Sequence, residues 1–221
     1  MWGMASSPLN VEKVPTLFDA FVAQSSPPAR NVFALCLGSS TGILTLGSEG
    51  SSHDPNSVAY TPIVTQEGFY TVWMTSVAVD GVDLNTTEKV LNKRGAIVDS
   101  GTVLPTLPTQ AFAALRQRFE LLCNGAQWRG VCRDLVAANA TLFDGTCYNF
   151  TSAELSTFPR ISISLRSNVT LDLPPSLYLR NNRSRAPVVF DCVSVTRHLP
   201  ASCALIPCRM LFQSVLMMIL R

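Results

Sequence analysis

The architecture of this chain follows from the segment Gly95-Ala96-Ile97-Val98-Asp99-Ser100-Gly101-Thr102, where an apolar run ends on a carboxylate that is followed by a hydroxyl, a glycine and a second hydroxyl. Ile97 and Val98 are typical of a strand covered on both faces. Gly101 lets a backbone amide approach the carboxylate, and the two hydroxyls can donate hydrogen bonds to it. The segment predicts a buried strand that delivers Asp99, held away from bulk water, to a tight loop suited to acid–base chemistry.

The tripeptide Asp-Ser-Gly alone is also typical of an ordinary turn, because these residues dominate turns. The longer pattern favours the catalytic interpretation, since Val103-Leu104-Pro105 follows and an amphipathic helix comes next. Pro108-Thr109 opens this helix, which we expect to cover the sheet beneath the loop. Its apolar face consists of Phe112, Leu115, Phe119 and Leu122.

The rest of the chain reads as mainly β. Short apolar runs separated by Gly, Ser, Asn and Pro occupy 31–84, and Asp80-Gly81 is a hairpin turn signal. Residues 161–165 alternate with period two and 169–173 form a second strand, and 188–192 predict a further one. A turn is expected at 174–179, and 123–147 reads as a surface loop.

A short helix is predicted from Val14 to Gln24, with Leu17, Phe18 and Phe21 packing on the core at helical spacing. Among the aromatic residues of the β region, Tyr60, Tyr70 and Trp73 are interpreted as core rather than ligand-binding residues.

Composition limits the possible classes of protein. With 221 residues, 47% apolar and 14% charged, the chain can bury a substantial core and is not disordered by composition. A net charge of +2, with scattered basic residues, gives no argument for a nucleic-acid partner. The apolar stretch after Arg209 is too short to span a bilayer, so no transmembrane segment is predicted.

Seven cysteines and five Asn-x-Ser/Thr sequons fit passage through an oxidising, glycosylating compartment. The sequons begin at Asn85, Asn139, Asn149, Asn168 and Asn182. The first seven residues have neither a basic start nor a long apolar core, so no signal peptide is predicted. We therefore expect a lumenal, extracellular or vacuolar protein of the secretory pathway whose beginning is missing.

A zinc site is the competing use of cysteine. No Cys-x-x-Cys pair occurs, and His53 and His198 are isolated, so neither a metal site nor a cofactor is predicted.

The chain resembles the pepsin-like aspartic proteases in several segments that occur in the family's order. Asp99-Ser100-Gly101-Thr102 with its flanking apolar residues looks like the family's second active-site loop. Trp2-Gly3-Met4-Ala5 is similar to a stretch of the amino-terminal lobe. Paired strands at the lobe junction are matched by 33–37 and 42–47, and the segments leading to the second loop by 60–63 and 69–72. The resemblance implies a carboxy-terminal lobe at 31–221 and a remnant of the amino-terminal lobe at 1–30.

Two further features come from this resemblance. The order of cysteines resembles a carboxy-lobe bridge of the membrane-anchored β-secretases, which implies a Cys147–Cys192 disulfide and leaves Cys123–Cys132 as a local bridge. The tail at 197–221 is similar to the family's final strands but diverges, with Pro207 in the place of a Gly and Leu220 in the place of an Asp.

In the family, two Asp carboxylates share a proton and activate a water that attacks the peptide carbonyl. The chain has one such Asp, Asp99, with Ser100, Gly101 and Thr102 as its supporting loop, because Asp144-Gly145-Thr146 lacks the intervening hydroxyl residue. The resemblance implies an aspartic endopeptidase with a peptide or protein substrate, whose missing amino-terminal lobe is its partner. The alternatives are a non-catalytic secreted β-domain that binds protein or carbohydrate, and a homodimer that supplies one Asp99 from each chain.

Overall fold

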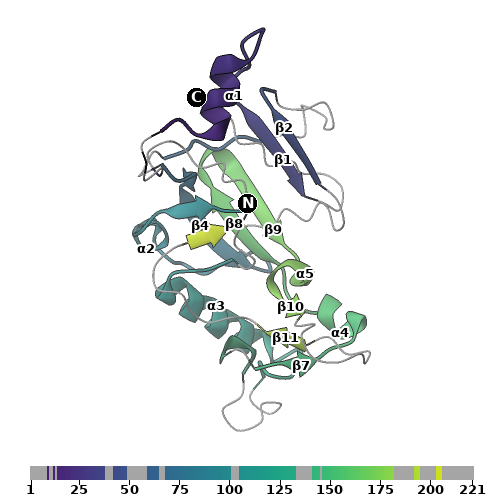
Figure 1. Ribbon diagram of the computed structural model, residues 1–221. Helices are drawn as coiled ribbons and strands as arrows, with labels where there is room; N and C mark the ends of the chain where they lie inside the picture. The colour runs from purple at the N-terminus through teal and green to yellow at the C-terminus, as the bar shows by residue number, and fades with distance from the viewer. Residues whose placement is uncertain are drawn as a thin grey trace.

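A computed structural model describes most of the chain, and its elements form short strands flanked by short helices (Figure 1). It describes residues 9, 12, 14–37, 42–48, 59–64, 68–100, 105–132, 141–144, 146–181, 192–194 and 203–205. The strands of these residues form four sheets with orders β1-β2, β10-β11-β7, β12-β6-β3 and β5-β4-β8-β9. The prediction of a mainly β chain is confirmed.

The central sheet is antiparallel and joins β5 (Val82–Asp83), β4 (Met74–Val79), β8 (Ile161–Leu165) and β9 (Val169–Leu173) in that order. In β8 burial alternates, with Ile161, Ile163 and Leu165 buried, which confirms the period-two prediction. Ile163 lies opposite Val77 of β4, which is fully buried, so these faces form the centre of the core.

The β4–β5 hairpin turns at Asp80-Gly81, as predicted. Both residues have positive φ, 47° and 73°, which matches the twist of two-residue hairpin loops. The Asp80 side chain also accepts a hydrogen bond from the backbone N–H of Arg160 at 2.9 Å. The turn is therefore joined to the segment that enters β8.

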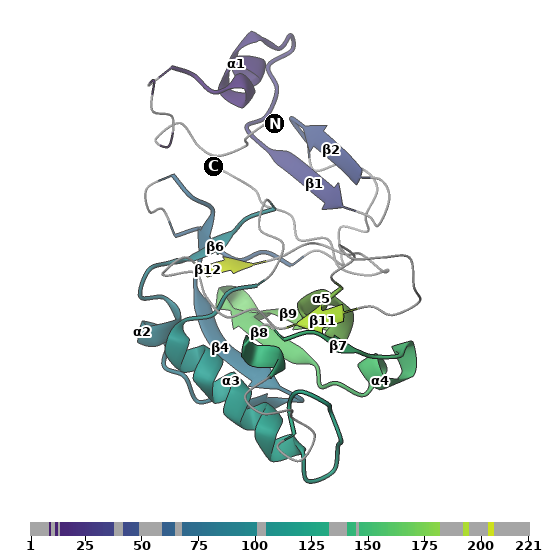
Figure 2. The ribbon, with the colours of Figure 1, turned by 60° about the horizontal axis from the view of Figure 1, so that its bottom comes forward.

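Helix α3 (Thr109–Leu122) contacts β4 and lies along one side of the sheet (Figures 1 and 2). Leu115 and Phe119 are buried, as predicted, and Ala111 is buried with them. The predicted apolar residues Phe112 and Leu122 are partly buried and pack against the same core.

An aromatic cluster fills the space beyond α3. Phe119 contacts Phe143, Trp128 and Tyr178 with ring centroids 5.7, 6.2 and 6.1 Å away. Phe143 belongs to a 3-10 turn, η4 (Leu142–Asp144), in the region predicted to be a surface loop. That prediction is wrong for Trp128, Leu142 and Phe143, which are buried because their apolar side chains pack under α3.

Two bridges accompany this cluster. Cys123 and Cys132 form a disulfide with a Cα–Cα distance of 5.5 Å, which confirms the predicted local bridge. Cys147 is also disulfide-bonded. It precedes β7 (Tyr148–Asn149), which pairs with β11 (Cys192–Ser194) so that Cys192 lies opposite Asn149. The Cys147–Cys192 pairing itself stays a prediction, and 188–191 of the predicted strand lie outside the described residues.

Four short elements complete the described fold. Helix α4 (Ser152–Ser156) follows β7, and α5 (Pro175–Tyr178) forms the turn predicted at 174–179. The buried Tyr178 hydroxyl donates to the Pro159 carbonyl at 2.7 Å. Strand β10 (Arg180–Asn181) then pairs with β11, and a 3-10 turn, η5 (Arg166–Asn168), joins β8 to β9.

Helix α1 (Leu17–Gln24) and the pair β1 (Phe33–Leu37) and β2 (Gly42–Leu46) lie at the opposite end from α3 (Figure 1). The helix begins later than predicted, because Thr16 is its N-cap and forms a capping box with Asp19. Phe18 is buried, but the predicted core role is wrong for Leu17 and Phe21, which are 63% and 37% exposed.

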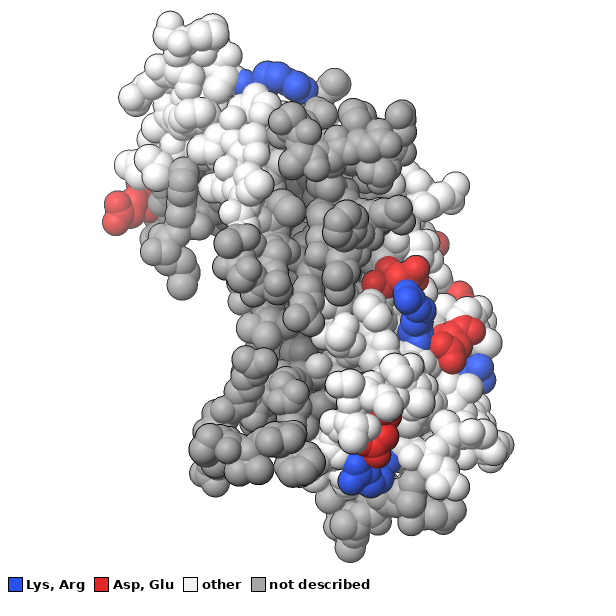
Figure 3. All heavy atoms as spheres, turned by 90° about the vertical axis from the view of Figure 1, so that its right-hand side faces the viewer, with Lys and Arg blue, Asp and Glu red and all other residues white. Residues whose placement is uncertain are grey.

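Surface charges lie in pairs. Arg116 and Glu120 of α3 are 2.9 Å apart, and Arg129 and Glu154 are 3.1 Å apart. On the face shown in Figure 3, acidic and basic side chains of the described residues also lie beside one another. Exposed pairs of this kind contribute little to stability.

Phe119→Ala should lower the free energy of unfolding by about 3–5 kcal/mol, because Phe119 is 1% exposed and meets three other rings. Leu121→Ala on the same helix removes a side chain that is 57% exposed and should change it by no more than about 0.5 kcal/mol. Urea unfolding of both variants checks this, and equal losses would contradict the assignment of the core.

Glu154 should make the stability of α4 depend on pH. Hydrogen bonds from the Thr151 backbone and hydroxyl, and then nearby Arg129, hold the pKa of Glu154 below its ordinary 4.5. Because the folded-state pKa is depressed, this stabilisation is present above about pH 4.5 and is lost as the pH falls below it. Glu154→Gln keeps the hydrogen-bonding shape but cannot titrate, so its unfolding free energy should fall less steeply in acid. Urea unfolding of both proteins at several acid pH values measures this. If the unfolding free energy of Glu154→Gln fell with pH as steeply as that of the original chain, the prediction would be contradicted.

Candidate active site

The predicted active-site strand, β6 (Ala96–Val98), is the middle strand of a three-stranded sheet. It pairs antiparallel with β3 (Thr71–Val72) on one side and parallel with β12 (Cys203–Leu205) on the other. Both edges of β6 are therefore occupied, as expected for a strand that must hold a side chain in a fixed position.

The chain enters β6 from α2 (Glu88–Leu91) through a turn at Gly95, whose φ is 78°. The Gly95 N–H donates to the Asn92 carbonyl at 3.0 Å, and only a residue without a Cβ adopts this backbone conformation without strain. At the other end of the strand, the Val98 N–H donates to the Tyr70 carbonyl at 2.9 Å. These two bonds fix the start and the end of β6.

Exposure increases along β6 toward Asp99. Ala96 is fully buried, Ile97 and Val98 are half-buried, and Asp99 and Ser100 are exposed. The prediction of a carboxylate held away from bulk water is therefore wrong for this chain: the strand is anchored at its buried start, and it presents Asp99 at its open end. Gly101 and Thr102 lie outside the described residues.

Strand β12 comes from the part of the tail that diverges from the resemblance. Its register places Ala204 beside Ile97 and Leu205 beside Val98, next to the strand end that carries Asp99. Pro207 and Leu220, the two departures noted in the sequence, lie outside the described residues.

Asp144, the other acidic residue in an Asp-Gly-Thr context, is used locally. The Thr141 hydroxyl donates to its carboxylate at 2.6 Å, and the Asp144 N–H donates to that hydroxyl at 3.2 Å. Asp144 thus closes the turn η4 beside the aromatic cluster, which agrees with its exclusion as a catalytic residue.

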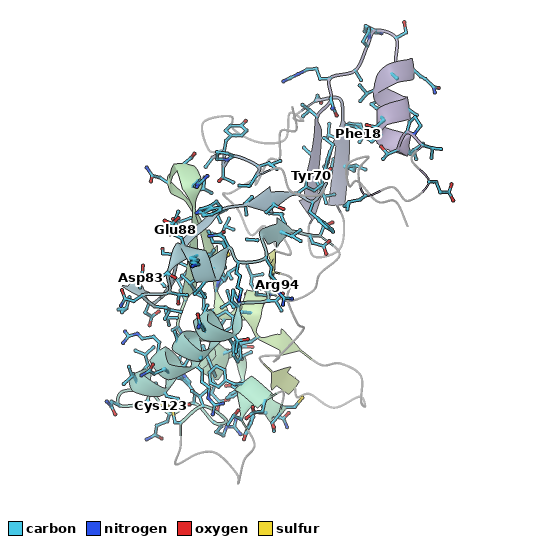
Figure 4. The ribbon with its side chains drawn as sticks, turned by 90° about the vertical axis from the view of Figure 1, so that its left-hand side faces the viewer. Phe18, Tyr70, Asp83, Glu88, Arg94 and Cys123 are labelled. Carbon is cyan, nitrogen blue, oxygen red and sulfur yellow. A yellow bond between two sulfur atoms is a disulfide. The ribbon has the colours of Figure 1, made fainter. Side chains whose placement is uncertain are left out.

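Tyr70 links the active-site strand to α1, a role that sequence analysis missed by reading it only as a core residue. Its ring lies 5.8 Å from Phe33 of β1, which in turn lies 5.7 Å from Phe18 of α1. Figure 4 shows Phe18 and Tyr70 beside the β1–β2 pair. Partial burial, and next the negative charge of Asp19, raise the pKa of Tyr70 to about 12. Its spacing from Asp99, 29 residues along the chain, left no local pattern that would have revealed the link.

The described residues offer no group of three or more His, Cys, Asp or Glu side chains arranged to hold a metal ion. In the same part of the chain, no helix is both long and apolar enough to cross a membrane.

Comparison with known proteins identifies the family of the chain. The profile of the eukaryotic aspartyl proteases matches residues 1–201, which is most of the chain. The chain belongs to the eukaryotic aspartyl protease family. Its mainly β structure is consistent with the pepsin-like fold expected from the sequence, here as a partial chain.

The relatives of this chain include several plant proteins. Aspartyl protease AED1 of Arabidopsis thaliana is 34% identical over 160 residues, which cover 70% of this chain and 32% of that protein. Protein ASPARTIC PROTEASE IN GUARD CELL 2 of the same plant is 28% identical over 72% of this chain and 34% of its own length. A fungal aspartic protease from Phaffia rhodozyma is 36% identical over 38% of the chain and 19% of its own length. The chain spans about a third of the length of the plant relatives.

Asp19→Asn should lower the pKa of the Tyr70 phenol by part of its elevation, because it removes the negative charge that opposes phenolate formation while burial, the larger cause, remains. The phenolate absorbance of the variant, compared with Tyr70→Phe to isolate this group, measures the shift. Asp83→Asn removes an exposed carboxylate from β5 and serves as the matched control. Equal Tyr70 titrations in both Asn variants would contradict the contact between α1 and the β3–β6 region.

Proposed function

We propose that this chain is the carboxy-terminal part of an aspartic endopeptidase and that Asp99 is one of its two catalytic carboxylates. Residues 31–221 would form the carboxy-terminal lobe, and 1–30 would be a remnant of the amino-terminal lobe. The observation that carries the proposal is the exposure of Asp99 at the open end of a strand paired on both edges. This arrangement fixes the carboxylate and leaves it accessible to a water and a substrate.

In the proposed reaction, Asp99 and a second Asp share one proton. Two carboxylates a few ångströms apart cannot both ionise, so one acts as base toward the attacking water while the other polarises the peptide carbonyl. Ser100, Gly101 and Thr102 would support the loop around Asp99. The second carboxylate would come from the remainder of the protease, since the chain spans about a third of its plant relatives.

Exposed apolar side chains support the proposal that an amino-terminal lobe covers this part of the molecule. They lie on α1, on β2, in the segment 59–64 and just before β3, where Phe69 is next to Tyr70, whose carbonyl binds the end of β6. The set comprises Leu17, Phe21, Ile43, Leu44, Tyr60 and Phe69, which are 37–63% exposed. Apolar side chains that gather in one region of a surface mark an interface.

The secretory pathway is the proposed location, as an extracellular, vacuolar or lysosomal lumenal protein. The Cys123–Cys132 disulfide and the bonded Cys147 support it, because disulfides persist in oxidising compartments. The match to the aspartyl protease family favours the protease over a non-catalytic binding domain.

The test restores the missing part of the enzyme. A chimaera that joins the segment of AED1 preceding the matched region to this chain should cleave peptides in acid and should be inhibited by pepstatin. Asp99→Asn in the chimaera should lower kcat by about 10²–10⁴-fold, because it removes a general acid–base group. Asp144→Asn, which alters a carboxylate used to close η4, should retain activity.

A folded, active chimaera that tolerates Asp99→Asn would remove Asp99 from the mechanism. Assays of the purified, refolded chain alone between about pH 3 and 7 distinguish the partial protease from the homodimer. Only the homodimer requires pepstatin-sensitive cleavage by this chain without a partner.

A further inference from the structure

We propose that Asn85, Asn149 and Asn168 carry N-linked glycans, and that the glycan on Asn149 is added only before α4 folds. The proposal rests on the passage through the secretory pathway proposed above, but not on proteolytic activity. In the reaction, the asparagine Nδ2 loses a proton and bonds to the anomeric carbon of the first sugar. The bond from that carbon to the pyrophosphate of a lipid-linked oligosaccharide breaks, lipid pyrophosphate leaves, and the proton is released to the solvent.

The three sequons within the described residues share one arrangement. Each asparagine is exposed, and so is the hydroxyl residue two positions later, namely Thr87, Thr151 and Thr170. Phe150 and Val169, the middle residues of two sequons, are buried, so the chain is anchored between the two exposed polar side chains. Exposed acceptors anchored in this way can bear a large hydrophilic group without disturbing the core.

Two of the sequons flank one surface cluster. The Arg166 guanidinium lies 4.4 Å from the centroid of the Trp73 ring, and the Trp73 indole N–H donates to the Glu88 carboxylate at 2.6 Å. Asn168 follows Arg166 by two residues, and Asn85 precedes Glu88 by three. Both asparagines are exposed and have positive φ, 57° and 53°, between regular elements. Glycans at these positions would shield the half-buried Trp73 from the surrounding water.

The Asn149 sequon lies elsewhere, in β7 at the end of the molecule that holds α4 (Figure 1). Its Thr151 hydroxyl is already engaged in the capping box of α4 in the folded chain. The hydroxyl donates to Glu154 at 2.8 Å and accepts from the Glu154 N–H at 3.2 Å. The Asn149 carbonyl accepts a hydrogen bond from Arg129, and the nearby Cys147 is disulfide-bonded. Because the transfer enzyme recognises the sequon hydroxyl, folding of α4 closes this acceptor.

The Asn85 sequon differs from the Asn149 sequon in the hydrogen bonding of its hydroxyl residue. Its Thr87 is the N-cap residue of α2, yet its side chain makes no capping hydrogen bond. Folding therefore leaves this hydroxyl available. The two sites should respond differently when folding is delayed.

The experiment expresses the full chain behind a cleavable secretion signal in a eukaryotic cell. Asn139 and Asn182, whose sequons lie outside the described residues, are replaced by Gln so that three sites remain. Enzymatic release of glycans converts each modified asparagine to Asp, which mass spectrometry locates. Formation of the Cys123–Cys132 disulfide in the same sample establishes that the chain entered the oxidising lumen.

We expect conversion of asparagine to Asp at all three sites. Each of the variants Asn85→Gln, Asn149→Gln and Asn168→Gln should migrate faster in gel electrophoresis by the mass of one glycan. Asn124→Gln, at an exposed asparagine that has no sequon, should lose none. An unmodified site in a lumenal, disulfide-bonded chain overturns the proposal for that site. The proposed location in the secretory pathway is tested separately, by whether the natural gene product enters the pathway without a foreign signal. Its failure would therefore be distinguishable from an unmodified sequon.

The timing is tested by pulse labelling with a membrane-permeant thiol reductant, which delays disulfide formation and folding. Occupancy of Asn149 should rise relative to the untreated cells, while that of Asn85 should stay unchanged. Equal changes at the two sites would overturn the claim that α4 folding closes the Asn149 acceptor.

Discussion

The pairing of β6 with two strands from distant parts of the chain is the constraint on which the rest of the candidate site depends. Strand β3 ends at Val72, 24 residues before β6 begins, whereas β12 begins at Cys203, 107 residues after it. The parallel β6–β12 pair cannot be closed by a hairpin and requires a long connection. In this chain the connection includes α3 and the strands β8 and β9, which pair with β4 to form the central sheet, so Asp99 is held in place only when most of the described fold has formed.

Because of this dependence, the residues that stabilise the fold and the residues of the candidate site lie in different parts of the molecule. The aromatic cluster around Phe119 and the Cys123–Cys132 disulfide stabilise the end of the molecule that contains α3. The strand that carries Asp99 lies closer to the β1–β2 end, where exposed apolar side chains are common. The end of the molecule that contains α3 is therefore rigid and the end nearer β1–β2 is accessible, which suits a functional site carried by a rigid scaffold.

Local patterns in the sequence were enough to predict the elements that depend on neighbouring residues. The period-two strand at 161–165, the Asp80-Gly81 hairpin and the helix that opens at Thr109 are all confirmed. The Cys123–Cys132 bridge, which came from the family resemblance and not from a local pattern, is also present. What sequence could not give is burial that depends on distant partners. Phe143 is buried because α3 happens to cover it, and Leu17 is exposed although its spacing matches that of a core residue. Hydrophobic periodicity reports which face of an element is apolar, but not whether anything in the same chain covers that face.

The exposure of Asp99 has the same physical origin as the exposure of the apolar residues near it. Tyr70 binds the end of β6 through its carbonyl and contacts Phe33 through its ring, so β6 and the β1–β2 pair are parts of one packed unit. Phe69, next to Tyr70, is 42% exposed, and Ile43 of β2 is 56% exposed. Leaving such side chains in water costs about 25 cal/mol for each Å² of apolar surface that a partner would otherwise bury. A second lobe that covers them would also enclose the carboxylate, and the same contact that removes the apolar surface from water would bring Asp99 into the low-dielectric setting in which paired carboxylates divide their roles.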